Sequence, residues 1–453
     1  MKKIVILSLD GVPLSLLEDF LERGLMPALK RKIEESKSKP VEIKSVHPCE
    51  SATAWTSFMT GNNPGKHNIY GFIDRHVESS KKGMYVVNSN YRKGDSLWKT
   101  LSGNGFKPIV INVPLNYPPE KLDGIVIGGF LSPPGNSGIV HPKKHEAYLN
   151  EIGYRPDPDN SLVKEDLSAW YEDLIDTENT RVNLAKKYFQ EESWDFFHLH
   201  VMGTDRLHHF LWEKWESNKG PWKEKFENFY SLIDSHLKWF FENGDDCVFV
   251  MLSDHGFCKT LHEFDLNSWL SENSWLDLGE NSSSFKPIVL PGSKAFSILP
   301  GRVYLNLEGR EEEGSVSKED YFSLRSSLRD EMLKIKDPSG KKVFKDIYFR
   351  EDIYFDDFSK NDFFLSAEKD FFTQYDLAPD LICFNRDGID LKASFDNDSE
   401  MFYHSPITGM HTFDNAFLWV SDKQALEGSI LDVAPSILNR FSIKSKMDGK
   451  VIF

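Results

Sequence analysis

The sequence predicts an α/β protein with a mostly parallel central sheet and helices on both of its faces. Two observations indicate this fold: short, nearly continuous apolar runs rich in β-branched residues, and long amphipathic segments between several of them. Apolar residues make up 40% of the 453 residues and aromatic residues 13%, enough to build a core. At this length we expect one large domain with an insertion, or two domains.

The first buried strand is expected at residues 4–9, where an apolar run is closed by Asp10-Gly11. Similar runs predict the remaining strands of the sheet: 41–46, 108–113, 124–129, 196–201, 247–254 and 416–420. Residues 162–190 and 222–243 carry apolar side chains at three- and four-residue spacing, which predicts helices that cross between parallel strands. In such sheets, ligands bind beyond the carboxyl ends of the strands, so the residues that follow each run are candidates for a site.

Residues 259–401 have weaker periodicity and more Ser, Gly and Pro, and we interpret them as a cap inserted into a core of residues 1–258 and 402–453. Within the cap, the acid- and aromatic-rich stretch 354–375 is interpreted as a solvated loop packed by its aromatic residues, with a lid as the alternative. Specificity for substrate is expected to reside in the cap and its loops.

Charge and cysteine content exclude several classes of protein. The net charge of −16 is spread along the chain, which argues against a general nucleic-acid surface or an anionic-membrane surface. The four cysteines form no CxxC pair, which favours free thiols in a reducing, cytoplasmic compartment. No segment approaches the roughly 20 apolar residues of a membrane span.

Two strand ends carry residues that suit a divalent cation. Asp10 follows the first strand, although an Asp-Gly pair is often only a turn. Asp254 and His255 follow the run 247–254, which places a carboxylate and an imidazole side by side. Such ligands suit Zn²⁺ or Mn²⁺, and the alternative is a turn with a capping aspartate.

A third group begins after the run 196–201. Asp205 and His209 are four residues apart, so a helix that begins at Thr204 places both on one face, where they can hold one metal ion. His208 is the rival ligand, and a helix-start aspartate with surface histidines is the alternative. His411 lies in a predicted loop before the last strand, where a lone histidine is usually a surface residue.

Ser51 stands at a predicted helix start that follows the strand 41–46. Backbone N–H groups and the positive end of the helix dipole lie close to a serine in this position, which favours a bound phosphate. A simple N-cap serine is the alternative reading.

The order of these pieces along the chain resembles the alkaline phosphatase superfamily. It is most similar to the type I phosphodiesterase/nucleotide pyrophosphatase branch and to related phosphohydrolases and phosphomutases. The resemblance runs from residue 3 to about residue 438. It includes these further motifs: Thr60-Gly61, the stretch 63–67, Asn112-Val113-Pro114, Tyr117-Pro118-Pro119 and the stretch 432–435.

The resemblance implies a nucleophile and two divalent cations. The family nucleophile falls on Ser51, whose hydroxyl also touches the second metal. One metal is implied at Asp205, His209 and His411, and the other at Asp10, Asp254 and His255. We expect zinc, with manganese as the alternative, because the ligands mix imidazole with carboxylate and include no thiolate. The implied reaction is in-line attack by Ser51 on phosphorus, a covalent phosphoseryl intermediate, and hydrolysis by a metal-activated water.

The chain departs from the family pattern in two places. Phe72 stands where nucleotide pyrophosphatases carry an asparagine that contacts a phosphoryl oxygen, and the sulfatase signature is absent around Cys49. Arg75 is a candidate substrate-binding residue, and Lys66 and Arg206 are further possible phosphate contacts, although each is more often a surface charge.

The sequence therefore predicts a phosphodiesterase or nucleotide pyrophosphatase that acts on a small-molecule phosphate ester. The alternatives are a phosphomonoesterase, a phosphomutase or phosphotransferase, and a binding protein that retains the fold.

Overall fold

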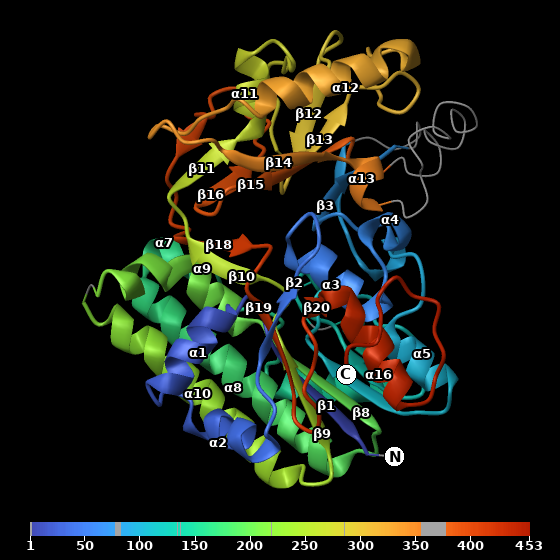
Figure 1. Ribbon diagram of the computed structural model, residues 1–453, viewed down its shortest axis with the longest axis vertical. Helices are drawn as coiled ribbons and strands as arrows, with labels where there is room; N and C mark the ends of the chain where they lie inside the picture. The colour runs from blue at the N-terminus through green and yellow to red at the C-terminus, as the bar shows by residue number, and fades with distance from the viewer. Residues whose placement is uncertain are drawn as a thin grey trace.

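The computed structural model describes residues 2–77, 83–133, 135, 137–218, 220–284, 286–354 and 377–453 (Figure 1). The largest sheet in these residues has nine strands. Their order is β20 (Gly428–Ser429), β2 (Val41–Lys44), β19 (Ala416–Val420), β9 (Val248–Leu252), β1 (Ile4–Leu9), β8 (Phe196–Val201), β5 (Pro108–Ile111), β6 (Ile125–Ile127) and β7 (Val140–His141).

The centre of this sheet is parallel, as the sequence predicted. Strands β9, β1, β8, β5 and β6 pair in parallel, while β19 runs antiparallel to both of its neighbours and β7 antiparallel to β6. Each predicted run contains a strand, and several strands are shorter than their runs because turn residues end them early. The carboxyl ends of β1, β8 and β9 therefore meet at one edge of the sheet.

Helices cover both faces of the sheet, which confirms the predicted fold class (Figure 1). Val5 and Leu7 of β1 pack in a cluster with α1 (Leu14–Glu22), α2 (Pro27–Ser36), α8 (Leu167–Glu191), α9 (Gly203–Glu216) and α10 (Trp222–Asn243). Ile4 and Ile6 face the other way, toward α3 (Ser51–Thr60), α5 (Leu97–Gly103) and α16 (Val433–Arg440). This alternation follows from the two-residue period of a strand.

The predicted helix 222–243 is α10, but the amphipathic segment 162–190 is divided in two. A short α7 (Leu162–Glu165) ends before Asp166, and α8 begins after it. The Asp166 side chain accepts hydrogen bonds from the backbone N–H groups of Ser168 and Ala169. The aspartate therefore caps α8, a signal that the apolar spacing alone does not show.

A second body with its own core lies above the sheet in Figure 1. It contains a four-stranded antiparallel sheet in the order β12 (Ala295–Ile298), β13 (Arg302–Leu305), β15 (Leu381–Asn385) and β14 (Phe344–Phe349). It also contains β11 (His262–Asp265), β16 (Ile389–Lys392), β17 (Phe402–Tyr403), α11 (Leu266–Glu272) and α12 (Lys318–Met332). The stretch 354–375, which we interpreted as a loop or lid, lies outside the described residues after Tyr354.

In the described residues, the upper body is joined to the core at several places, two of which involve paired strands. An antiparallel pair, β10 (Gly256–Lys259) and β18 (Gly409–Thr412), links the two bodies. A hairpin of the core, β3 (Ile73–Arg75) and β4 (Met84–Val86), reaches up to it. There, Arg302 donates hydrogen bonds to Ile73 O (2.5 Å) and to Asp74 Oδ2 (3.2 Å).

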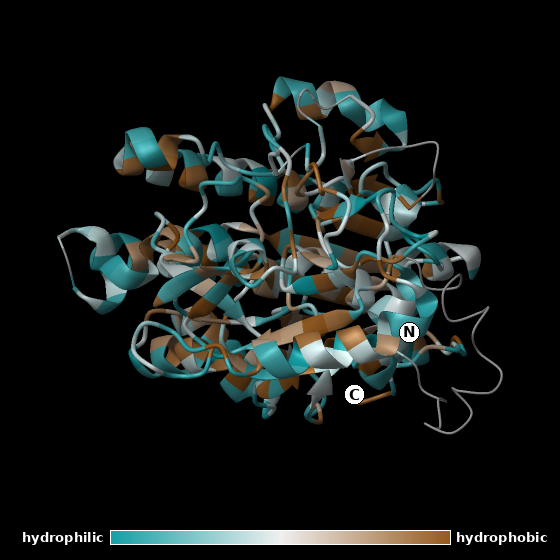
Figure 2. Ribbon diagram, turned by 90° about the horizontal axis from the view of Figure 1, so that it is seen from above, coloured by the Kyte–Doolittle hydropathy of each residue, from teal (hydrophilic) through white to brown (hydrophobic). Residues whose placement is uncertain are grey.

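The hydropathy of the elements follows this layering. Figure 2 shows hydrophobic strands in the interior and helices that carry both hydrophobic and hydrophilic residues. Among the described helices, none combines the length and the apolar composition that a membrane crossing needs.

Candidate active site

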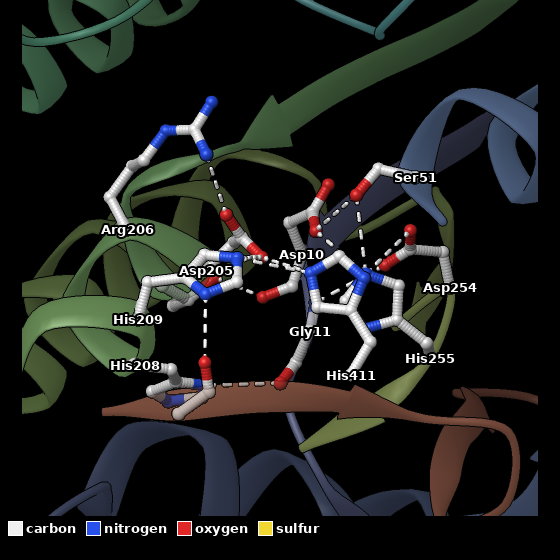
Figure 3. A network of polar contacts seen from close by, with 12 residues as sticks. Asp10, Gly11, Ser51, Asp205, Arg206, His208, His209, Asp254, His255 and His411 are labelled. Atoms are coloured by element: carbon white, nitrogen blue, oxygen red, sulfur yellow. Dashed lines mark hydrogen bonds and ion pairs between the residues drawn. The ribbon is translucent and has the colours of Figure 1, made fainter. Parts of the chain in front are cut away.

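The ends of three neighbouring strands bring the predicted ligand residues together (Figure 3). Asp10 follows β1, and Asp254 with His255 follows β9. Asp205 lies in the first turn of α9, directly after β8. We expected His411 in a loop, and this prediction was wrong. His411 lies on strand β18. The parallel topology thus gathers residues from positions 10 to 411 into one place.

The first group of possible metal ligands consists of Asp10, Asp254 and His255. One donor atom from each lies within 4.8 Å of the others, and all three side chains are fully buried. Ser51 adjoins this group as the first residue of α3: its Oγ donates to Asp10 Oδ1 at 3.3 Å and lies 3.2 Å from His255 Nε2. The serine hydroxyl is therefore within reach of an ion held by this group.

The second group consists of Asp205, His209 and His411. The Nε2 atoms of the two histidines lie 3.4 Å and 3.2 Å from Asp205 Oδ1 and 3.1 Å from each other. The rings of His255 and His411 stack with their centroids 3.7 Å apart, so the two groups are adjacent. This spacing suits a pair of ions that share one substrate group.

Hydrogen bonds orient two of the imidazoles for metal binding. His209 Nδ1 lies 2.9 Å from Gly409 O, and His255 Nδ1 lies 3.0 Å from Gly256 O. Because a carbonyl oxygen only accepts, each Nδ1 carries the hydrogen and each Nε2 keeps its lone pair. Backbone contacts of this kind are common behind metal-ligating histidines.

His208, the rival ligand, faces away from both groups. Its Nδ1 lies 3.0 Å from Gly11 O, and its Nε2 lies 2.7 Å from the hydroxyl of Tyr230. Both ring nitrogens are therefore engaged inside the core, and α9 presents His209 on the same face as Asp205.

The electrostatics of the first group fit a bound cation. Burial, followed by the charge of Asp10, raises the pKa of Asp254 well above its usual range. Burial opposes ionisation of Asp10 too, but His200 and His255 outweigh it and lower the pKa of that carboxyl. Asp254 Oδ2 is buried and accepts no hydrogen bond, although His255 Nε2 lies 3.3 Å away. A divalent cation would satisfy this oxygen and relieve the repulsion between the carboxylates.

The imidazoles of the site are suited to the same role. Burial, followed by the influence of His411, lowers the pKa of His255 to about 3, so its ring is neutral near pH 7. A metal ligand must be a neutral imidazole. For Asp205, burial is outweighed by His209, His411 and Arg206, and the pKa falls well below its usual value. The donors present thus fit two divalent cations.

A cavity of about 230 Å³ opens beside the two groups, between the core and the upper body. From the core it is lined by Ser51, Phe72, Asp205, Arg206, His209 and His411. From the upper body it is lined by Leu299, Phe384, Asp387, Asp390 and Lys392. A substrate whose phosphorus lies near Ser51 would therefore place its remaining part against both bodies.

The predicted substrate-binding residues have different surroundings. Phe72 lines the cavity, where its ring packs edge-on against Phe130 at a centroid distance of 4.9 Å. Arg75 lies outside the residues that line the cavity: its guanidinium contacts Glu311 at 2.9 Å and lies 3.7 Å above the ring of Tyr304. The described position of Arg75 thus joins the hairpin to the upper body rather than facing Ser51.

The two further phosphate candidates also differ. Lys66 is half exposed and pairs with Asp448. Arg206 lines the cavity and is partly fixed there by Asp205 Oδ2 at 3.0 Å and Asp157 Oδ1 at 2.9 Å. Its guanidinium lies 4.3 Å from the centroid of Phe130. Of these two basic residues, only Arg206 lines the cavity next to Ser51.

Several residues around the site were not singled out from the sequence. Glu50 lines the cavity next to Ser51, and burial raises the pKa of its carboxyl to about 7. Trp55 and His200 both contact Asp10. Trp55 is four residues after Ser51, so helical spacing could have placed it on the same side of α3. Lys392 lies in β16 of the upper body, whose position no motif indicates.

Fold and site together define a class: an alkaline phosphatase-like α/β protein with two adjacent carboxylate–imidazole groups beside a helix-start serine. The sequence matches the model of the Type I phosphodiesterase / nucleotide pyrophosphatase family over residues 4–414, and the chain belongs to this family. Membership supports a phosphoester hydrolase. No curated protein matches the chain in sequence.

Solved structures share the fold at low sequence identity. Phosphonoacetate hydrolase from Sinorhizobium meliloti 1021, in complex with phosphonoformate, is 16% identical with a TM-score of 0.60, over 96% of this chain and 94% of that chain. Murine ectonucleotide pyrophosphatase/phosphodiesterase 5 is 9% identical with a TM-score of 0.57, over 99% and 98%. The human protein of the same name is 11% identical with a TM-score of 0.55, over 99% and 97%.

Proposed function

We propose that this protein is a metal-dependent phosphodiesterase of the nucleotide pyrophosphatase type, with Ser51 as its nucleophile. The observation that carries the proposal is the position of Ser51 Oγ. It lies 3.3 Å from Asp10 Oδ1 and 3.2 Å from His255 Nε2. His411 of the Asp205 group stacks on His255, so the second group is adjacent. A nucleophile beside two ligand groups is the arrangement that phosphoryl transfer requires.

Each of the two groups would hold one divalent cation. The Asp10 group supplies two carboxylates and one imidazole, and the Asp205 group supplies one carboxylate and two imidazoles. This donor set favours zinc, with manganese as the alternative. When bound, such a pair of ions neutralises charge on the phosphoryl oxygens and lowers the pKa of the attacking hydroxyl.

The side chains of the protein position the reacting atoms. Asp10 and His255 fix Ser51 Oγ at the start of α3, where it faces the cavity. The Ser51 hydroxyl loses its proton to solvent, and Oγ forms a bond to phosphorus while the bond to the leaving oxygen breaks. Solvent protonates the leaving oxygen. Water then attacks the phosphoserine, the Oγ–phosphorus bond breaks, and the serine hydroxyl is restored. Arg206 lies beside the cavity and can contact a phosphoryl oxygen.

We propose residues 259–401 as a cap that supplies part of the substrate site. Phe384, Asp390 and Lys392 of this region line the cavity opposite Ser51. An inactive form of the murine relative has been solved in complex with AMP, so a nucleotide is one substrate to test here.

The four cysteines are all unpaired, which supports the reducing, cytoplasmic location that we propose.

A phosphomonoesterase is the second candidate, and Phe72 favours it. An aromatic ring cannot donate a hydrogen bond to a phosphoryl oxygen, so a diester would have to be oriented by other groups. Arg206, by contrast, offers a guanidinium to the additional charge of a monoester.

The experiment is a comparison of catalytic efficiency on an aryl phosphodiester and on the matching monoester, with Zn²⁺ or Mn²⁺ added. We expect hydrolysis that a chelator abolishes, with the diester preferred. A preference for the monoester by orders of magnitude would replace the diesterase proposal with the phosphomonoesterase. Hydrolysis of neither ester would contradict both.

A further inference from the structure

Two buried nitrogen atoms contact Asp10 from behind. Trp55 Nε1 donates to Asp10 Oδ2 at 2.8 Å, and His200 Nε2 lies 3.1 Å from the same oxygen. The other oxygen, Oδ1, faces Ser51 Oγ at 3.3 Å and His255 Nε2 at 3.6 Å. The two carboxylate oxygens therefore have different tasks: Oδ2 is engaged by the protein, and Oδ1 is turned toward the site.

The contacts continue from His200 into the sheet. Ser8 Oγ lies 3.0 Å from His200 Nδ1 and 2.8 Å from His198 Nε2. The register of β1 and β8 places Ser8 directly opposite His200, so the three side chains share one face of the sheet. All of them are fully buried beneath α3, where the ring of Trp55 packs edge-on against His200 at 4.7 Å.

The chemistry of Asp10 sets the direction of this chain. An ionised carboxylate only accepts, so His200 Nε2 carries the hydrogen, and in the neutral ring Nδ1 is an acceptor. The hydroxyl of Ser8 then donates to His200 and accepts from His198 Nε2. His198 Nδ1, left without a hydrogen, has no partner among the described residues, as this direction requires. Each donor in the series thus points toward Asp10.

Burying such a chain of polar side chains inside a hydrophobic sheet costs free energy of desolvation. Its neighbours on the same face, Ile6 of β1 and Phe58 of α3, belong to a cluster of buried apolar residues. Apolar side chains at positions 8, 198 and 200 would avoid the desolvation of two imidazoles and a hydroxyl. A buried polar network of this kind instead specifies one geometry. Here the geometry that it specifies is that of Asp10.

We propose that His200, supported by Ser8 and His198, is a positioning residue that makes Asp10 Oδ1 the single ligand atom of this carboxylate and strengthens cation binding by the Asp10 group. The inference rests on the proposed function, because it needs a cation at Asp10, Asp254 and His255. It assigns no contact with substrate to His200. Partners behind a ligand typically change metal affinity by about 10- to 100-fold.

The test isolates one metal site. In a His209→Ala background, only the Asp10 group remains complete, and its affinity for Zn²⁺ is measured by competition with a chromophoric chelator. Adding His200→Leu should weaken binding by about 10- to 100-fold. Adding His200→Gln should restore most of the affinity, because the amide of glutamine can replace the Nε2 donor. A purely structural role for His200 would not produce this recovery.

Two further variants complete the experiment. Ser8→Ala cuts the chain one step behind His200 and should weaken Zn²⁺ binding by a smaller factor, and it decides the question if His200→Leu does not fold. His67→Leu is the matched control, since His67 is also fully buried but bonds to Ser57 Oγ at 2.8 Å, outside both groups. Unchanged affinity in the His200 and Ser8 variants overturns this inference alone. A parent protein that binds no cation overturns the proposed function and the inference with it.

Discussion

The core and the upper body both bury charged side chains, but they compensate these charges in different ways. In the upper body, Asp380 is fully buried and contacts Arg310 through both of its oxygens, at 2.9 Å and 2.6 Å. Tyr321 donates to the same carboxylate at 2.5 Å. In the core, three buried carboxylates gather around imidazoles, and Arg206 is the one arginine that pairs with them in the described residues.

The pKa values of two aspartates express this difference. Burial raises the pKa of Asp380, but Arg310 outweighs it and holds that pKa below its usual range. Burial and the charge of Asp10 both raise the pKa of Asp254. Arginine therefore compensates Asp380 of the upper body, whereas in the described residues neither Asp10 nor Asp254 contacts an arginine or a lysine. A buried charge that the protein leaves uncompensated indicates a ligand, and here a divalent cation is the ligand that fits.

The largest expected effect is on turnover, in the core. Ser51→Ala should lower catalytic efficiency by at least about 1000-fold, because the attacking oxygen is removed. The fold and the bound metal should remain, since Asp10, Asp254 and His255 still offer three donors. Steady-state kinetics and elemental analysis of the same preparation check both parts. Turnover near the parent value would remove Ser51 from the mechanism.

The next effect concerns stability and separates the two regions. Asp380→Asn should lower the free energy of unfolding by about 3–5 kcal/mol, because Arg310 loses its buried partner. Metal content should not change. Asp254→Asn should instead abolish metal binding at the Asp10 group. It should change the stability of the metal-free protein by less than about 1 kcal/mol, because no buried arginine or lysine loses its partner.

Urea unfolding of both variants in the presence of chelator measures this contrast. Equal destabilisation by Asp380→Asn and Asp254→Asn would contradict the difference between the core and the upper body.

A third effect is the pH dependence of stability, which the neutral histidines of the core produce. Burial lowers the pKa of His67 from 6.5 to about 3. Below pH 6.5, His67 binds a proton in the unfolded chain but stays neutral in the folded protein. The folded state should therefore lose about 1.4 kcal/mol per pH unit from this group as the pH falls from 6.5 toward 3, and nothing above 6.5.

The variant His67→Gln removes this contribution. Its free energy of unfolding should fall less steeply than that of the parent between pH 6.5 and 5, measured by urea denaturation of metal-free protein. Parallel pH profiles for the two proteins would show that His67 is protonated in the folded state.

The smallest effect is on substrate preference. Phe72→Asn places an amide donor in the cavity, and one additional hydrogen bond to a phosphoryl oxygen should raise the efficiency on an aryl phosphodiester by about tenfold. The efficiency on the matching monoester should change less. Phe72→Leu is the control, because it changes the size of the side chain without adding a donor. If asparagine does not alter the diester-to-monoester ratio, Phe72 does not face the phosphoryl group.

The sheet and the strand-end ligands could be predicted because both follow from local pattern. The apolar runs before Asp10 and Asp254 indicate buried strands, and parallel pairing brings their ends to one edge. The four-residue spacing of Asp205 and His209 places them on one face of α9. These inferences need only the period of a strand or a helix.

Other features depend on contacts between distant segments and have no local signal. His411 is a loop histidine by sequence, but pairing of β18 with β10 brings it over His255. Arg75, a predicted substrate-binding residue, contacts Glu311, which lies far along the chain. The chain of His198, Ser8 and His200 is equally non-local, because it depends on the register of β1 and β8.

Two divalent cations at the core site are the central proposal for this protein, and metal stoichiometry is its direct test. Elemental analysis of the purified parent should give two ions per chain, with zinc as the main element. His411→Ala should keep only the ion of the Asp10 group, and a strong chelator should remove both ions together with activity. A parent that contains no metal, and whose hydrolysis of phosphate esters is unaffected by chelator, would contradict a two-metal site.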